Sequence, residues 1–124
     1  MSGKTILYVE DNELNRRIVR DLLKRTSYKL IEAYDGEAGI ATALAERPDL
    51  ILMDIQLPKI SGLGVMRRLR TEAATATTPM IALTSFALSG DDKRAKEAGA
   101  TAYLSKPFSP MALLALIRKL LPES

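Results

Sequence analysis

The chain contains no cysteine and no histidine. Without cysteine it can form neither a disulfide bond nor a metal site built from thiolates. The lack of histidine excludes histidine-based catalysis, histidine-ligated zinc and a role as a phosphohistidine carrier. Tryptophan is also absent and there are only two phenylalanines, so a surface that stacks nucleic-acid bases is not expected. We therefore predict no direct DNA binding.

Long apolar runs are missing as well. No stretch reaches the length of a membrane-spanning helix, and residues 1–5 do not form a signal peptide. We therefore expect no membrane association and a cytoplasmic location. The 124 residues, with 47% hydrophobic content and a net charge of +3, are typical of one ordinary globular domain. The prediction is a single domain over residues 1–124, with no output domain attached.

What the chain does contain is a regular alternation of short apolar runs and longer amphipathic segments. Runs that are apolar throughout indicate strands buried on both faces, as in a parallel sheet. Their alternation with helical segments favours an α/β sandwich. The predicted strands are Thr5–Val9, Lys29–Ala33, Asp49–Met53, a fourth strand opened by Pro79, and Thr101–Leu104.

The helical segments carry start and stop signals and apolar faces. Asp35, Ser61 and Ser109 are predicted N-caps, and Pro110 a first-turn proline. Ser89 with Asp92 is a capping-box pattern, and Gly99 marks the end of that helix. The first helix is predicted over Glu13–Arg25. The inner faces that we expect are Leu14, Ile18, Leu22 and Leu23 in the first helix; Ala38, Ala41, Leu44 and Ala45 in the second; Leu63, Met66 and Leu69 in the third; and Met111, Leu114, Ile117 and Leu121 in the last.

Polar side chains stand where four of the strands end. Each has an ordinary explanation as a helix cap, a turn former, a locally bonded hydroxyl or a surface lysine. However, the carboxyl ends of parallel strands meet at one edge of the sheet, where ligands bind. The sequence therefore favours one cleft that holds acids, a hydroxyl and an ammonium. Its members are Glu10 and Asp11 after the first strand, Asp54 after the third, Thr84 on the fourth and Lys106 after the last.

This set of groups suits a divalent cation and a phosphoryl group. Mg²⁺ prefers carboxylate and water oxygens, and Mn²⁺ is the alternative. Carboxylates within ~5 Å repel one another by about 3 kcal/mol per pair at an effective dielectric near 20, which a cation relieves. A carboxylate beside a metal, such as Asp54, can attack phosphorus and form an aspartyl phosphate. The bond between Lys106 and Pro107 is a candidate cis peptide that would aim the lysine into the cleft.

Three stretches carry a resemblance to a known family: Val9-Glu10-Asp11-Asn12-Glu13-Leu14-Asn15, Leu52-Met53-Asp54-Ile55-Gln56-Leu57-Pro58 and Ser105-Lys106-Pro107-Phe108. With these motifs the chain resembles the receiver domains of two-component response regulators over essentially all its residues. It most resembles single-domain regulators of the cell-division type and the receivers of hybrid histidine kinases. The resemblance implies a flavodoxin-like sheet of five parallel strands, in the order 2-1-3-4-5, with helices on both faces.

The resemblance also implies roles for the strand-end residues. Asp54 would be the phosphoacceptor, and Lys106 would contact the phosphoryl group. Thr84 would hydrogen-bond that group, and Tyr103 would be the aromatic switch that turns inward when Thr84 moves. The phosphoryl donor would be a histidine kinase or a histidine phosphotransfer protein. The fourth helix, last strand and last helix would then change shape and control a downstream protein target. The implied Mg²⁺ ligands are Glu10, Asp11, Asp54 and the main-chain carbonyl of Gln56.

Several questions stay open at this point. Gln56 and Phe86 occupy positions that influence phosphate lifetime in the family, and neither is an acid or base, so we predict slow self-dephosphorylation with Phe86 shielding the phosphoryl group. One alternative function is a Mg²⁺-dependent phosphohydrolase, which Gln56 disfavours, and another is an adaptor that works without phosphorylation. The basic run on the first helix is either a solvated face or a docking surface for a partner: Arg16, Arg17, Arg20, Lys24 and Arg25.

Overall fold

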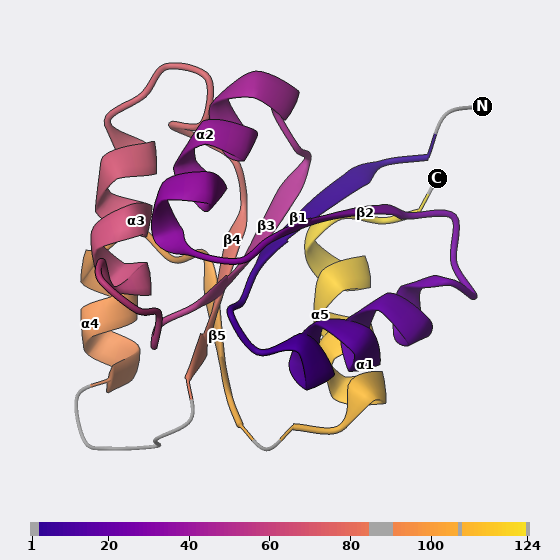
Figure 1. Cartoon of the computed structure of the whole chain (residues 1–124). Helices are drawn as coiled ribbons and strands as arrows, with labels where there is room; N and C mark the ends of the chain where they lie inside the picture. The colour runs from indigo at the N-terminus through magenta and orange to yellow at the C-terminus, as the bar shows by residue number, and fades with distance from the viewer. Residues whose placement is uncertain (1–2, 85–90, 107, 124) are drawn as a thin grey trace.

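The computed structural model describes residues 3–84, 91–106 and 108–123. Its strands form one parallel sheet in the order β2-β1-β3-β4-β5, with helices on both faces (Figure 1). The predicted α/β fold and strand order are therefore confirmed. In the described ranges, no helix is both long enough and apolar enough to cross a membrane. The elements are β1 (Thr5–Val9), α1 (Glu13–Leu23), β2 (Lys29–Ala33), α2 (Gly36–Glu46), β3 (Leu50–Asp54), α3 (Gly62–Arg70), β4 (Met80–Thr84), α4 (Asp91–Glu97), β5 (Ala102–Ser105) and α5 (Pro110–Leu120).

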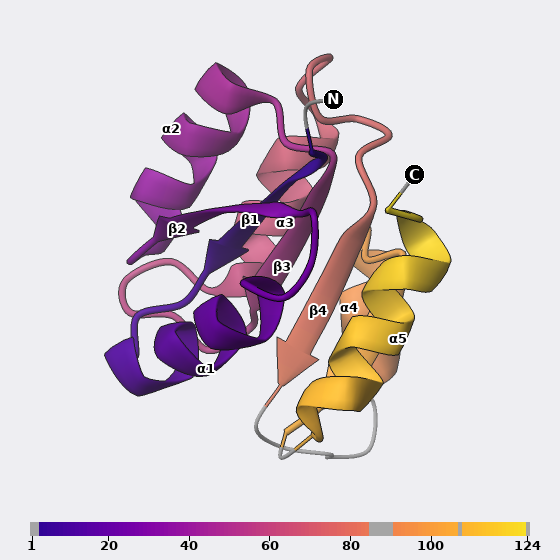
Figure 2. The same cartoon turned by 90° about the vertical axis from the view of Figure 1, so that its right-hand side faces the viewer.

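The sheet separates two hydrophobic cores, because successive side chains of a strand point to opposite faces. In β1, Leu7 and Val9 pack toward α2, α3 and α4, whereas Ile6 and Tyr8 pack toward α1 and α5. Figures 1 and 2 show the same division of the helices, with α1 and α5 side by side on one face. The alternation continues at the carboxyl edge, so Glu10, two residues after Tyr8, emerges on the side of α1 and α5.

The ends of three elements differ slightly from the prediction. Helix α1 ends at Leu23 rather than Arg25, because a turn follows in which the Thr26 main-chain N–H donates to the Leu23 carbonyl. Strands β3 and β5 each lie one residue later than predicted. The shift in β3 makes Asp54 the last residue of the strand, where it pairs in register with Leu83 of β4. The carboxylate therefore projects from the end of the central strand, where the backbone is still paired with β4.

The predicted caps are confirmed wherever the structure describes them. Asp35, Ser61 and Ser109 each accept a main-chain N–H of the first helical turn, and α5 begins with its predicted proline. Gly99 follows α4 with a φ of 112°, the left-handed conformation that glycine adopts readily at a helix end. The predicted capping box begins at Ser89, which lies outside the described residues.

The predicted inner face of α1 was partly wrong. Leu23 is buried, but Leu14 and Ile18 are 63% and 45% exposed. Val19 and, unexpectedly, Arg16 are buried in their place. Arg16 turns inward because its guanidinium has partners at the carboxyl edge of the sheet, and this rotates the apolar leucine and isoleucine outward.

Two other inner faces also need correction. In α2, Ala41 and Ala45 are exposed, whereas the predicted Ala38 and Leu44 pack against the core together with Gly39 and Ala43. A Cβ on Gly39 would lie 2.9 Å from a methyl carbon of Val9, so the glycine lets the helix approach the sheet closely. In α5, Met111 is 64% exposed, whereas Leu113, Leu114 and Ile117 are the buried residues of the helix.

Arg70, at the end of α3, ties together two loops at the end of the sheet opposite the strand-end acids. Its guanidinium donates to the carbonyls of Thr75, Ala76 and Thr78 at 3.0, 3.1 and 2.7 Å. It also donates through two nitrogens to the carbonyl of Gly99, at 3.0 and 2.8 Å. These five hydrogen bonds all end on main-chain carbonyls, so the charged guanidinium serves as a cluster of donors to the backbone. Burial correspondingly lowers the pKa of Arg70.

Replacing Arg70 with methionine is expected to lower the free energy of unfolding by about 2–4 kcal/mol, since hydrogen bonds from a charged donor contribute about 1.5–3 kcal/mol and are not additive. The methionine keeps the length of the stem and removes only the donors. Equilibrium denaturation in urea measures the change. The exposed Arg67→Met variant of the same helix is the matched control and should unfold like the wild type. Equal midpoints for the two variants would contradict this role of Arg70.

Candidate functional site

The first two acids follow β1 directly. Glu10 is buried, with 1% of its surface exposed, and Asp11 is exposed. The main chain of Glu10 is fixed on both sides: its N–H donates to the Ala33 carbonyl at 3.0 Å, and its carbonyl accepts from Arg16 Nη1 at 2.8 Å. The buried arginine of α1 therefore holds the backbone that carries the acidic pair.

Arg16 in turn has its own partners. Its guanidinium lies 2.7 Å from Glu13 Oε1, 3.4 Å from Glu32 Oε1, and 4.2 Å from the centre of the Tyr34 ring. Arg20, one turn later, forms a two-pronged pair with Glu32, at 2.8 and 2.7 Å. The interpretation of the whole basic run as a solvated face was therefore wrong for the buried Arg16, whereas Arg20 is paired but partly exposed and Arg17 is exposed.

The third acid, Asp54, is 3% exposed at the end of β3. Its Oδ1 accepts the main-chain N–H of Gln56 at 3.0 Å. The loop then folds back tightly: the Ile60 N–H donates to the Pro58 carbonyl at 2.8 Å, in a γ-turn around Lys59, whose φ is 67°. A Cβ at Gly62 would lie 2.0 Å from the Asp54 carbonyl oxygen, so α3 can start this close to the strand only with glycine.

These acids meet at the carboxyl edge of the sheet. One carboxylate oxygen from each of Glu10, Asp11 and Asp54 lies within 4.8 Å of the others. The ammonium of Lys106, from the loop after β5, lies 3.0 Å from Glu10 Oε1 and 3.4 Å from Asp54 Oδ2. The fold thus brings four of the five predicted residues into contact range of one another, and the lysine lies nearer to Glu10 than to Asp54.

The crowding of buried carboxyl groups changes their acidity. Burial, a hydrogen bond with Glu10 and the charge of Glu10 raise the pKa of Asp54 from 3.8 to about 7, although Lys106 opposes the shift. Burial also acts to raise the pKa of Glu10, but hydrogen bonds with Asp54 and Lys106 and the lysine charge outweigh it, so that pKa is lowered. Without a cation, the two carboxyl groups therefore share one proton at pH values below about 7.

The donor set fits Mg²⁺. Hard oxygen ligands in small number, partly open to water, are what this ion prefers, and Asp11 provides the open side. The raised pKa of Asp54 is the second indication, since it reports negative charge that the protein alone does not neutralise. Glu10, Asp11 and Asp54 are therefore the residues that would hold the ion. The predicted contribution of the Gln56 carbonyl stays a prediction.

Thr84 and Tyr103 lie on the other side of the sheet, toward α4. Thr84 ends β4 with 1% exposure, and its carbonyl accepts the Lys106 N–H at 2.5 Å. Tyr103 of β5 is half-buried against the core of α2, α3 and α4. The hydroxyl of Ser105 donates to the Tyr103 hydroxyl at 3.2 Å. The lysine backbone thus connects the pocket of acids to the strand that carries Thr84.

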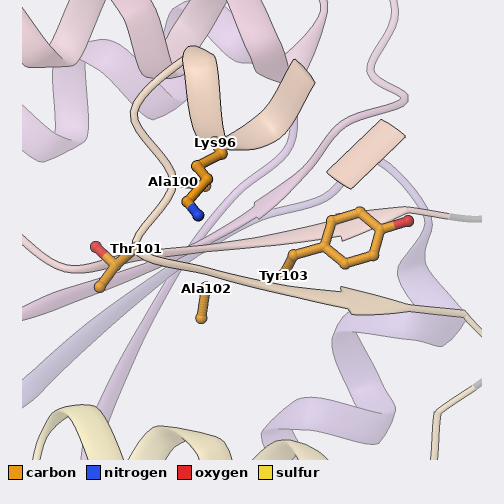
Figure 3. A pocket seen from close by; sticks show the side chains of 5 residues that line it. All are labelled: Lys96, Ala100, Thr101, Ala102 and Tyr103. Carbon is orange, nitrogen blue, oxygen red and sulfur yellow. The ribbon is translucent and has the colours of Figure 1, made fainter. Parts of the chain in front are cut away.

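A shallow pocket of about 290 Å³ lies between α4 and β5, beside Tyr103 (Figure 3). Figure 3 shows the Tyr103 ring extending along β5, with its hydroxyl directed away from Lys96 and Thr101. The pocket wall and the predicted switch residue therefore belong to the same strand. Its lining residues are Lys96, Ala100, Thr101, Ala102 and Tyr103.

The sequence interpretation missed the side chains that surround Glu10. Tyr8 donates its hydroxyl to Glu10 Oε1 at 3.0 Å, and Asn15 Nδ2 donates to the same oxygen at 3.3 Å. The sequence pattern identified Tyr8 only as a residue of an apolar strand. Its position two residues before Glu10 places the two side chains on the same face of the sheet. Arg16 counted only as one of a basic run. Phe86 and Pro107 lie outside the described residues, so phosphoryl shielding and the cis peptide stay predictions.

Comparison with known proteins adds independent information. Residues 6–118 match the family model described as the response regulator receiver domain. The polar-differentiation response regulator DivK of Brucella anthropi is 41% identical over 121 residues, which cover 98% of each chain. Among solved structures, the chemotaxis response regulator CheY4 of Vibrio cholerae has a TM-score of 0.89 at 30% identity, covering 95% of this chain and 98% of its own.

A second solved structure is similar in fold and holds a metal ion. It is the receiver domain of the sensor histidine kinase PA1611 from Pseudomonas aeruginosa PAO1, with a TM-score of 0.88 at 35% identity. The match covers 95% of this chain and 97% of that one. That structure has a magnesium ion coordinated in its active-site cleft.

Proposed function

This chain belongs to the family of response regulator receiver domains, and on that premise we propose that Asp54 accepts a phosphoryl group from a phosphohistidine of a partner protein. The family works in two-component signalling and does not consist of classical enzymes, which sets the phosphohydrolase alternative aside. The observation that carries the proposal is the buried Asp54 carboxylate, with two acids and one ammonium beside it. The partner must supply the histidine, since this chain has none.

The proposed transfer is an in-line displacement. A carboxylate oxygen of Asp54 attacks phosphorus; the new O–P bond forms as the P–N bond to the imidazole breaks. The bonding electron pair returns to the imidazole nitrogen, which leaves protonated by solvent. When bound, Mg²⁺ supplies positive charge to the phosphoryl oxygens. Lys106 is close enough to Asp54, at 3.4 Å, to turn its ammonium toward the same group.

The response to phosphorylation is proposed to reach the other side of the sheet through Thr84 and Tyr103. The main-chain hydrogen bond from Lys106 to Thr84 supports this link, because it ties the phosphate-side loop to β4. The half-buried position of Tyr103 leaves its ring room to move. The altered face would comprise α4, β5 and α5, and it would bind the downstream target.

The partner that donates the phosphoryl group is proposed to be a histidine kinase or a histidine phosphotransfer protein in the cytoplasm. Large apolar side chains are exposed on α1 and at the start of α5, two helices that lie side by side (Figure 2), and they support a docking role for these helices. They are Leu14, Ile18 and Met111. Gln56, which is exposed next to Asp54, is proposed to leave the acyl phosphate long-lived, because an amide cannot activate a water.

Incubation with Mg²⁺ and acetyl phosphate is expected to add the mass of one phosphoryl group to the wild-type protein and nothing to an Asp54→Asn variant. The amide keeps the shape of the side chain but lacks a carboxylate oxygen that could attack phosphorus. The substitution also removes a buried negative charge, so the variant is expected to fold. Intact-mass spectrometry reads the result. No adduct on the wild type would favour a phosphorylation-independent adaptor, and equal adducts on both proteins would show that another residue is modified.

A further inference from the structure

Three donors converge on a single oxygen of Glu10. Its Oε1 accepts from the Tyr8 hydroxyl at 3.0 Å, from Asn15 Nδ2 at 3.3 Å and from Lys106 Nζ at 3.0 Å. Its Oε2 accepts the main-chain N–H of Asn12 at 3.3 Å. A carboxylate oxygen offers about two lone-pair directions, so the three donors on Oε1 compete with one another. The ammonium is one of three ligands of that oxygen and is not its sole partner.

Under the proposed function, on which this inference rests, Lys106 has to leave Glu10. Its ammonium bridges Glu10 and Asp54 in the structure and would turn toward a phosphoryl group once Asp54 carries one. Removing the partner of a buried charge is strongly unfavourable, because the remaining charge is left desolvated and unpaired. Glu10 is 1% exposed, so water does not readily replace the ammonium. The cost of releasing Lys106 therefore depends on what else holds Oε1.

Tyr8 is suited to hold Oε1 throughout. It is 1% exposed and packed between β1 and the helices α1 and α5, so its hydroxyl cannot swing away. Its hydroxyl donates to Glu10 Oε1 at 3.0 Å and so acts as a neutral donor. The Tyr8 hydroxyl is neutral, so it is not drawn toward the charge of the phosphoryl group as the Lys106 ammonium is. Asn15, in the first turn of α1, adds a second neutral donor.

We propose that Tyr8, with Asn15, is a positioning residue that keeps Glu10 satisfied when Lys106 moves to the phosphoryl group. The pair of neutral donors weakens the resting contact between Lys106 and Glu10 and reduces the loss when that contact breaks. Tyr8 thereby favours the phosphorylated form without touching the phosphoryl group itself.

The test uses Tyr8→Phe, which removes one oxygen atom and keeps the ring. Beryllofluoride, which binds a carboxylate oxygen in place of a phosphoryl group, is titrated in saturating Mg²⁺ and followed by NMR of the main-chain amides. The variant is expected to bind beryllofluoride about three- to tenfold more weakly, the range that one buried hydrogen bond accounts for. Asn15→Ala should show a smaller loss in the same direction, since its bond is longer and the helix tolerates alanine.

The affinity for Mg²⁺ alone, measured by calorimetry, separates this role from a general support of Glu10. Removing the Tyr8 hydroxyl strengthens the contact between Lys106 and Glu10, and this disfavours Mg²⁺ binding. It also frees a lone pair of Glu10 Oε1, and this favours Mg²⁺ binding. The two effects offset each other, and we expect a change of less than about twofold. An equal loss of affinity for Mg²⁺ and beryllofluoride would overturn the proposal, because Tyr8 would then serve only to shape the cation site.

Tyr28→Phe is the matched control. Its hydroxyl also donates a hydrogen bond inside the fold, to the Leu121 carbonyl near the end of α5 and far from the acids. It should affect stability but leave beryllofluoride binding at the wild-type level. If the wild type binds beryllofluoride and Tyr8→Phe binds it as tightly, the role of Tyr8 is wrong and the proposed function stands. If the wild type itself forms no adduct, the proposed function fails and the role of Tyr8 fails with it.

Discussion

In a chelating buffer, the protein is expected to lose stability as the pH rises from about 4 to about 7, and saturating Mg²⁺ is expected to abolish that loss. Asp54 is the cause, because burial and the neighbouring Glu10 raise the pKa of its carboxyl from 3.8 to about 7 in the folded state. Between those values the folded protein holds a proton that the unfolded chain has released. Stability conferred by a raised pKa is complete below the unfolded pKa and is lost as the pH passes through the folded pKa.

The expected slope is at most about 1.4 kcal/mol per pH unit, the value for one proton. Glu10 does not offset this slope. Its pKa is lowered in the folded state, and the stability that a lowered pKa provides is already complete above the ordinary pKa of 4.5. Bound Mg²⁺ removes the slope, since both carboxyl groups are then ionised at every pH in the window. Urea unfolding at pH 5, 6, 7 and 8, with chelator or with Mg²⁺, measures the effect.

Asp54→Asn is the control for this prediction, because its amide does not titrate. In chelator it should show a flat profile over the same pH values and be more stable than the wild type at pH 8. A wild-type slope that persists unchanged in Asp54→Asn would assign the titration to another group. A wild-type profile that is flat in chelator would contradict the raised pKa of Asp54.

Much of the fold was predictable from local patterns. Apolar runs such as Leu50–Met53 identify strands buried on both faces, and the caps at Asp35, Ser61 and Ser109 mark helix starts through single hydrogen bonds. Both signals depend on residues close together in the sequence. The strand order came from the family resemblance rather than from these patterns, and the hydrogen-bonded sheet has that order.

The faces of the helices were less predictable, because they depend on distant partners. The four-residue spacing of Leu14, Ile18 and Leu22 indicated an inner stripe, yet the helix turns so that Arg16 reaches Glu10 and Glu32. A charged residue on the buried side is invisible to a hydrophobic pattern. Helix α2 gave a misleading pattern for a different reason: Ala41 and Ala45 turn outward, and the close approach to Val9 of the sheet is made by Gly39, which no hydrophobic pattern marks.

The residues of the candidate site were likewise predictable only in part. Glu10, Asp11, Asp54 and Lys106 were predictable because strand ends of a parallel sheet converge on one edge. The surroundings of Glu10 were not, because Tyr8 looks like any apolar strand residue until its hydroxyl is placed beside the carboxylate. The detailed sharing of Lys106 between two acids depends on distances that no spacing rule provides.

Lys106→Met is expected to change the affinities for Mg²⁺ and for beryllofluoride in opposite directions. The ammonium lies 3.0 Å from Glu10 Oε1 and 3.4 Å from Asp54 Oδ2, so its charge opposes any cation bound by these carboxylates. Unit charges 4 Å apart interact by about 4 kcal/mol at an effective dielectric near 20, and solvent screening reduces this further. We therefore expect Mg²⁺ to bind about ten- to a hundredfold more tightly once the lysine charge is gone.

For beryllofluoride the same substitution should weaken binding at least about tenfold, because the bound anion loses a hydrogen bond from a positively charged donor. Calorimetry gives the Mg²⁺ affinity, and amide NMR in saturating Mg²⁺ gives the beryllofluoride affinity. Lys119→Met, an exposed position near the far end of α5, makes the same change in net charge and should leave both affinities near the wild-type values. Weaker binding of both ligands to Lys106→Met would mean that the lysine shapes the pocket. Opposite shifts would identify Lys106 as a group whose charge opposes a bound cation and attracts a phosphoryl group.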